Sequence, residues 1–258
     1  MRHVPAIAAR EIRSAFSTPV AYVLISAYLF IAGFLFFGSF GFFLIQLQQI
    51  QAYGLHHLLE RMNLNDIVIA QSFGTFATLM AFLVPLLCMR AFAEERATGS
   101  IELLLTSPLT SWEIVIGKYL AILALIALIV ALTALFPALL FAYGDPELWQ
   151  TLANLLTLFA YSAGIAALCC FVSALTRSQI VAAVVGLIAS VLLLVLDFAA
   201  ESTSSEVVQQ VLRYVGTSGH FEPGLRGQVR LEDLTYFGVM ALVFLSLCRA
   251  AVESLRWR

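Results

Sequence analysis

Residues 20–45 read VAYVLISAYLFIAGFLFFGSFGFFLI, without one charged side chain. A helix crosses the hydrocarbon core of a bilayer with about 20 predominantly apolar residues, so this stretch is long enough to span it. Arg2, Arg10 and Arg13 precede it, as basic residues precede a secretory signal, but the apolar run is too long for one. The stretch therefore predicts a retained membrane-spanning helix.

The rest of the chain repeats this composition. It has 258 residues, of which 61% are hydrophobic and 12% charged, whereas about a quarter of the residues in a soluble domain are charged. We predict an all-α integral membrane protein with a single transmembrane domain over residues 1–258. Its six spans are expected near residues 20–45, 67–89, 119–143, 148–175, 178–196 and 234–252.

Small residues and prolines within the spans predict how the helices pack. Ala182, Gly186 and Ser190 recur every four residues on the fifth span, a spacing that lets helix backbones approach closely. We expect this stripe to form a helix contact. Pro85 and Pro137 are expected to kink spans 2 and 3, because proline removes a helical hydrogen bond.

The basic residues predict the orientation, because Lys and Arg near span ends are retained on the cytoplasmic side. One set of loops and span ends holds Arg2, Arg10, Arg13, Arg90, Arg96, Lys118, Arg177, Arg249, Arg256 and Arg258. The other set holds only Arg61, Arg213, Arg226 and Arg230. We therefore expect both termini to be cytoplasmic and the loop at residues 197–233 to be extracytoplasmic.

That outer loop is long for a connection in a compact membrane domain, so we expect it to have structure of its own. Residues 206–213 have helical spacing, and residues 220–226, HFEPGLR, are typical of a turn. The loop either caps a pathway, contacts an extracytoplasmic protein or is simply solvated.

The connection between spans 2 and 3 holds the most informative sequence. Span 2 is expected to continue as a charged helix through Glu94, Glu95 and Arg96. Gly99 would end it, because glycine tolerates the positive φ of a helix C-terminus. The two spans are therefore joined by structured segments.

A second short helix is expected directly afterwards. Ser100 is a suitable N-cap, residues 102–105 (ELLL) supply a first-turn acid and an apolar surface, and Pro108 ends the element. Thr110 and Glu113 then predict a capping box that begins the helix of span 3. The result is a short helix across the inner face, joined to two spans.

The stretch EERATGSIELLLTSP at residues 94–108, with Gly117-Lys118 at the start of span 3, resembles the permease subunits of type-2 ABC transporters. The N-terminal sequence AREIRSAFSTPVAY at residues 9–22 is similar to that of the gliding-motility (Gld-type) permeases within this group. The resemblance implies a location in the bacterial inner membrane. It also implies a cytoplasmic coupling helix at about residues 100–106 that docks on a separate ATPase subunit.

Two permease chains, identical or related, and two ATPase chains would form the working unit, with ATP and Mg held by the ATPase. An extracytoplasmic protein and membrane lipid are further expected partners, and no nucleic acid is expected. The residues implied in ATPase coupling are Glu94, Glu95, Arg96, Gly99, Glu102, Leu103, Leu104 and Pro108.

The first eighteen residues have the pattern of an amphipathic helix lying in the membrane interface. Arg10 and Arg13 lie opposite an apolar side that Glu11 interrupts. The apolar side holds Val4, Ala8, Ile12, Ala15 and Phe16. The alternative is that these residues act only as a positively charged topology signal.

The sequence thus favours the membrane subunit of an ATP-driven transporter, performing export or extracytoplasmic mechanical work. It has no ATPase motif, since Gly117-Lys118 lacks the upstream glycine of a phosphate-binding loop. An ion-coupled secondary transporter or a channel is the alternative, although the spans are almost free of ionisable residues apart from Asp197 at an outer end.

An intramembrane protease is a further alternative, but it requires a base or metal ligands at membrane depth. All four histidines lie outside the predicted spans, and His56, His57 and Glu60 belong to an outer loop. We therefore expect the chain to be no enzyme and to bind no metal or cofactor of its own.

Polar residues within the spans are candidates for a transport pathway. Gln71 and Thr75 share one face of span 2, and Tyr161 lies on span 4. Hydrogen bonds between helices explain these residues equally well, so both interpretations stay open.

Overall fold

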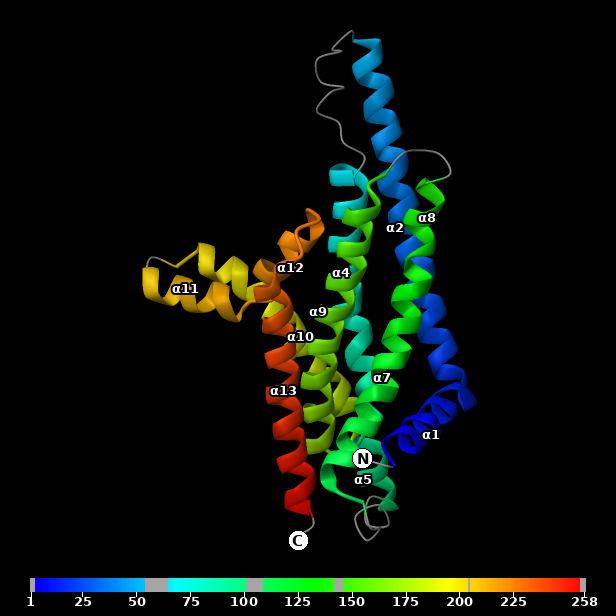
Figure 1. Ribbon diagram of the computed structural model, residues 1–258, viewed down its shortest axis with the longest axis vertical. Coiled ribbons are helices and arrows are strands. Elements are labelled where there is room, and N and C mark those ends of the chain that lie inside the picture. Colours follow the sequence, from blue (N-terminus) through cyan, green and yellow to red (C-terminus); the bar gives the residue numbers. More distant parts are fainter. Residues whose placement is uncertain (1–2, 54–64, 101–108, 142–145, 204, 256–258) are drawn as a thin grey trace.

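The structure is a computed structural model that describes residues 3–53, 65–100, 109–141, 146–203 and 205–255. These residues form helices with short connections, and no strand occurs among them. Most helices run along the axis of an elongated bundle, whereas α1 (Val4–Ser17) lies at an angle to it at one end (Figure 1). The predicted all-α fold is confirmed.

Within the residues that the structure describes, six segments are long and apolar enough to cross a membrane, in agreement with the predicted number. They comprise, in chain order, α2 (Pro19–Ala52), α4 (Gln71–Cys88) with α5 (Ala93–Thr98), α7 (Ser111–Thr133) with α8 (Leu135–Leu140), α9 (Leu148–Leu175), α10 (Gln179–Glu201) and α13 (Leu231–Ser254). A π-helical stretch, η1 (Asn65–Ala70), precedes α4. Two short helices, α11 (Glu206–Val215) and α12 (Ser218–Leu225), lie between α10 and α13.

The two ends of the bundle differ. The helices α1 and α5 and the last turns of α13 lie at the same end, which we call the α5 end (Figure 1). The helices α11 and α12 lie toward the other end, called here the α12 end, and α11 projects to the side (Figure 1). α2 continues beyond the predicted apolar run to Ala52, through a glutamine-rich sequence that keeps its helical conformation.

α9 forms the centre of the bundle. It packs against α4, α7, α10 and α13. Of the residues in its apolar membrane-spanning stretch, 61% are buried within the chain, compared with 22% for α10 and 28% for α13. The difference leaves broad apolar faces on the outer helices, as expected of a protein that is surrounded by lipid rather than water.

The third span breaks where proline predicts a break. α7 ends at Thr133, whose carbonyl oxygen is the acceptor that the missing N–H of Pro137 would have used. The short α8 then presents Phe136 to Phe36 of α2, with ring centroids 5.7 Å apart. Pro85, in contrast, lies inside α4 without ending it.

The small-residue stripe on α10 is a helix contact within the chain. A Cβ on Gly186 would lie 3.3 Å from the Sγ of Cys169 and 3.4 Å from the Cβ of Pro85. The hydroxyl of Ser190 hydrogen-bonds the carbonyl of Gly186 (2.8 Å), so it does not need a partner across the interface. The stripe therefore packs α10 against α9 and α4, the partners that sequence alone did not identify.

The turn predicted at residues 220–226 is wrong, because these residues belong almost entirely to α12. The carboxylate of Asp197 on α10 accepts hydrogen bonds from the backbone N–H groups of Ser218 (3.0 Å) and Gly219 (3.3 Å), which satisfies the helix start. Gly224 packs directly on Thr157 of α9. Pro223 and the glycines suggested a turn, whereas a cap from a distant helix makes the helix possible.

Candidate coupling site at the α5 end

The start of α5 is held by the end of α9. The hydroxyl oxygen of Ser173 accepts hydrogen bonds from the backbone N–H groups of Phe92 (3.1 Å) and Ala93 (3.2 Å) and donates one to the carbonyl of Met89 (3.2 Å). Ser173 is fully buried. A side chain from another helix thus caps α5, in place of the missing side-chain cap at its own N-terminus.

The rest of α5 is also fixed. The guanidinium of Arg96 hydrogen-bonds the carbonyl oxygen of Ala174 on α9. Gly99 ends the helix with φ of 75°, as the sequence predicts, and the hydroxyl of Thr98 lies 2.9 Å from that of Ser100. α5 is therefore a rigid element whose C-terminus leads directly into residues 101–108.

α1 packs closely on α7 because position 117 is glycine. A Cβ at Gly117 would lie 2.8 Å from the Cβ and Cγ2 atoms of Ile7 and 3.4 Å from the carbonyl oxygen of Val4. Both Val4 and Ile7 are buried. Any larger residue at position 117 would force α1 away from α7.

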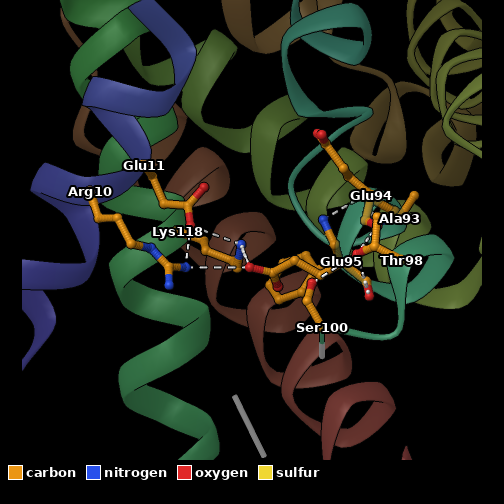
Figure 2. A network of polar contacts seen from close by, with 10 residues as sticks. Arg10, Glu11, Ala93, Glu94, Glu95, Thr98, Ser100 and Lys118 are labelled. Carbon is orange, nitrogen blue, oxygen red and sulfur yellow. Dashed lines mark hydrogen bonds and ion pairs between the residues drawn. The ribbon is translucent and has the colours of Figure 1, made fainter. Parts of the chain in front are cut away.

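A buried lysine joins these elements. The Nζ atom of Lys118 on α7 lies 3.1 Å from Oε1 of Glu11 on α1 and 2.9 Å from Oε1 of Glu95 on α5. The Lys118 side chain is only 2% exposed, and its Nζ lies 5.4 Å from the centroid of the Phe92 ring. Figure 2 shows the ammonium group between the two carboxylates.

Arg10 completes the cluster. Its Nη2 atom lies 2.7 Å from Oε1 of Glu11 and 3.4 Å from Oε1 of Glu95 (Figure 2). We call Arg10, Glu11, Glu95 and Lys118 the Lys118 network. With two cations and two carboxylates it is electrically balanced, which is the condition under which charges are tolerated away from water.

The electrostatics of Glu11 agree with this arrangement. Burial raises the pKa of its carboxyl group, but the charge of Lys118 and the hydrogen bonds from Arg10 and Lys118 outweigh burial, so the pKa lies below its ordinary value. A hydrogen bond with Glu11 likewise raises the pKa of Arg10. Glu11 interrupts the apolar side of α1 because that is the side on which Lys118 lies.

The structure brings only part of the predicted coupling set together. Glu95 belongs to the Lys118 network, Arg96 contacts α9, and the Glu94 side chain is exposed. Glu102, Leu103, Leu104 and Pro108 lie outside the described residues, as do most of the predicted coupling helix at 100–106 and the pair His56 and His57 with Glu60.

On the predicted interfacial helix, Arg10 joins the network, Arg13 is exposed, and Phe16 packs edge-on against Tyr22. The capping box of Thr110 and Glu113 is present at the start of α7. From the sequence, Lys118 is identified only within the Gly117-Lys118 motif and as a topology residue, and both the ion pairs of Lys118 and the cap from Ser173 are missed, because their partners are far away in the chain.

The pathway candidates do not form one surface. Tyr161 is fully buried, with ring centroids 5.4 Å from Phe221 and 5.9 Å from Phe237. The hydroxyl of Thr75 donates to the backbone carbonyl of Gln71 on its own helix (3.1 Å). A hydrogen bond within α4 thus accounts for Thr75, whereas the buried hydroxyl of Tyr161 makes no hydrogen bond within the described residues and Gln71 is exposed, so the pathway role of these residues stays a prediction.

His220 lies outside the bundle core and holds the α12 end together. Its Nδ1 atom is 2.9 Å from Oδ1 of Asp233, and its Nε2 is 3.2 Å from the carbonyl oxygen of Tyr214. Both ring nitrogens are therefore engaged. Within the described ranges, no group of three His, Cys, Asp or Glu side chains is placed to hold a metal ion.

Fold and site together define a multi-pass helical membrane protein with the Lys118 network at its α5 end. The chain belongs to the ABC-2 family transporter proteins, whose sequence profile matches residues 5–248. It is thus a membrane permease of an ABC transporter, the component that is not itself catalytic, and the predicted resemblance to type-2 ABC permeases is confirmed at this level. No curated protein matches the chain.

Proposed function

We propose that the chain couples ATP hydrolysis on a separate ATPase subunit to export or to mechanical work across a bacterial inner membrane. The observation that carries this proposal is the Lys118 network, which joins α1, α5 and α7 through one buried ammonium group. The ATPase, with its ATP and Mg, would dock at the α5 end on residues 94–108. The finer assignment to the gliding-motility type rests on the N-terminal sequence alone.

The contacts of α5 supply a route for force. Glu95 connects α5 to α7 and, through Lys118, to α1, while Ser173 and Arg96 connect it to α9. A push on the residues that follow Gly99 would therefore reach three helices at once. Packed side chains, hydrogen bonds and ion pairs of this kind can carry energetic coupling between distant sites.

The distribution of basic residues supports an orientation with the α5 end in the cytoplasm, where Lys and Arg are retained. Within the described residues, α11, α12 and the turn that follows them carry only Arg213, Arg226 and Arg230. The α5 end carries Arg10, Arg13, Arg90, Arg96, Lys118, Arg177 and Arg249. Both termini would then be cytoplasmic, and α11 and α12 would face a partner or solvent outside.

The broad apolar faces of the outer helices support a second permease chain as a partner. On α10, Ile180 is 75% exposed and Ile188 59% exposed within the single chain. Lipid or a second copy would cover them. We propose a working unit of two permease and two ATPase chains.

The test is copurification of the full chain with an ATPase, followed by reconstitution in lipid nanodiscs. We expect Glu95→Gln to leave the complex assembled and to lower the permease-dependent part of ATP hydrolysis about tenfold, because a hydrogen bond between charged groups contributes roughly 1.5–3 kcal/mol. Glu253→Gln is the matched control, since among the described residues Glu253 forms an ion pair with Arg249 on its own helix and takes no part in the Lys118 network. Absence of any copurifying ATPase, or equal rates for Glu95→Gln and wild type, would contradict the proposal.

A further inference from the structure

A cavity of about 120 Å³ lies at the α5 end, between α1, the start of α2, the end of α4 and α7. Its walls are partly charged and partly apolar. Arg90 and Glu94 line one part, whereas Leu24, Leu87, Ile122 and Leu125, all on membrane-spanning segments, line another. An amphipathic ligand matches such walls better than a small ion does.

Arg90 is the one arginine that lines this cavity among the residues that the structure describes. Its Nε atom is buried and makes no hydrogen bond within the described part of the chain. The guanidinium of Arg90 lines a largely apolar cavity, where a ligand that supplies an acceptor would stabilise its charge. Phosphate oxygens suit guanidinium groups particularly well.

The charges that line the cavity also limit which polar group an amphipathic ligand can place there. Lys118 and Glu11 line it too, but they neutralise one another within the Lys118 network. Arg90 and Glu94 remain, a cation and a carboxylate four positions apart in the sequence, and they form no ion pair with each other in the part of the chain that the structure describes. A headgroup with both a phosphate and an ammonium complements this pair, whereas a purely anionic headgroup would meet the Glu94 carboxylate.

We propose that the cavity binds one phospholipid with a primary ammonium headgroup, taken from the bilayer leaflet at the α5 end. Its phosphate accepts hydrogen bonds from Arg90, its ammonium donates to Glu94, and the first part of one acyl chain lies along Leu24, Leu87 and Ile122. The volume admits only part of a lipid, so the remaining hydrocarbon stays in the bilayer.

The position of the site gives the lipid a consequence for the fold. Glu11, Ser14 and Ala15 of α1 line the cavity opposite α4 and α7. A bound lipid therefore fills the space beneath α1, next to the Lys118 network, and holds the helix in place. This inference concerns lipid binding alone, so it can fail while the coupling proposal stands.

The test uses the purified full-length chain, delipidated in detergent and titrated with phosphatidylethanolamine while native mass spectrometry counts bound lipid. We expect one lipid to bind about tenfold more tightly than phosphatidylcholine or phosphatidylglycerol, the difference that one charge-assisted hydrogen bond supplies. Arg90→Gln should lower this affinity about tenfold, and Glu94→Gln should remove the preference over phosphatidylcholine. Arg177→Gln, an exposed residue at the same end that does not line the cavity, should bind as wild type does.

A second variant keeps the test decisive if Arg90→Gln does not fold. Ala15→Leu keeps both charges and fills the cavity from α1, so it should also lower binding. Equal affinity for the three lipids, or wild-type binding by Arg90→Gln or Ala15→Leu, would overturn the proposal. Displacement of the lipid by glycerophosphoethanolamine or inorganic phosphate at equal concentration would overturn it too, because the site would then recognise a soluble phosphate.

Discussion

The two ends of the bundle are stabilised by different kinds of interaction. At the α5 end, helices distant in the chain are joined by charges, with the buried Lys118 between Glu11 and Glu95. At the α12 end, the carboxylates of Asp197 and Asp233 accept hydrogen bonds from a helix start and from His220 rather than pairing with a buried lysine, and Gly224 packs directly on Thr157. Charged contacts depend on protonation and lose much when one partner is removed, whereas packing contacts depend on shape. If the proposed coupling is right, the α5 end is the one that responds to a change at its surface.

The largest effect is expected from breaking the charged end. Lys118→Met should lower the free energy of unfolding by about 3 kcal/mol, because two carboxylates then lose their buried cation. Chemical unfolding in detergent measures this change. If the network acts as a unit, Lys118→Met with Glu95→Gln should cost less than the sum of the two single variants. An additive double variant would mean that the two residues do not interact.

At the packed end, Gly224→Ala tests whether shape is decisive. The new Cβ would lie 2.4 Å from Oγ1 of Thr157, so α12 must shift, at about 1–3 kcal/mol. Gly238→Ala on α13 is the matched control, since no atom lies within 4 Å of its Cβ position. The thermal midpoints of the two variants should therefore separate clearly, and coinciding midpoints would show that α12 yields without strain.

A smaller effect is expected at Ser173, which joins α9 to α5 without a charge. Ser173→Ala removes the acceptor for two backbone N–H groups, at about 1 kcal/mol. Ser246→Ala serves as control, because that hydroxyl bonds only a carbonyl of its own helix. Limited proteolysis near residues 93–100 should be faster in Ser173→Ala alone. Equal cleavage of both variants would exclude a role for the cap.

The smallest effect concerns pH. The Glu11 pKa in the folded chain lies below its ordinary value of 4.5, so the ionised carboxylate stabilises the fold. This stabilisation is complete above the ordinary pKa and is lost as the pH falls through the lower, folded value. Stability of the wild type should thus decline more steeply below pH 4.5 than that of Glu11→Gln. Parallel pH profiles would show that folding does not change the pKa of Glu11, so that the network does not stabilise its carboxylate.

The helices could be predicted from the sequence because a membrane-spanning helix requires a continuous apolar stretch, which is a local property of the sequence. A charge-free window such as residues 20–45 needs no knowledge of its neighbours. Gly99 and the Thr110–Glu113 capping box are equally local, and the structure has both. The predicted coupling helix itself stays a prediction, since it falls mostly on residues that the structure does not describe.

The tertiary contacts could not be predicted in the same way. Lys118 and Glu11 are 107 positions apart, and Ser173 and Phe92 are 81 apart. The sequence gives only one indication of the Lys118 network, namely that Glu11 lies on the otherwise apolar side of α1. The error at α12 has the same origin, since its cap comes from Asp197, 21 positions before Ser218. Contacts across such distances leave no pattern in a single sequence.

The most direct test of the central claim is hydrogen exchange of the full chain in nanodiscs, comparing wild type with Lys118→Met. If Lys118 holds α1 and α5 on α7, amide exchange should accelerate about tenfold or more within residues 4–17 and 93–98, for a loss of local stability above about 1.4 kcal/mol. Exchange within residues 218–225 at the α12 end should stay unchanged. Unaltered protection of α1 and α5 in the variant would contradict the claim.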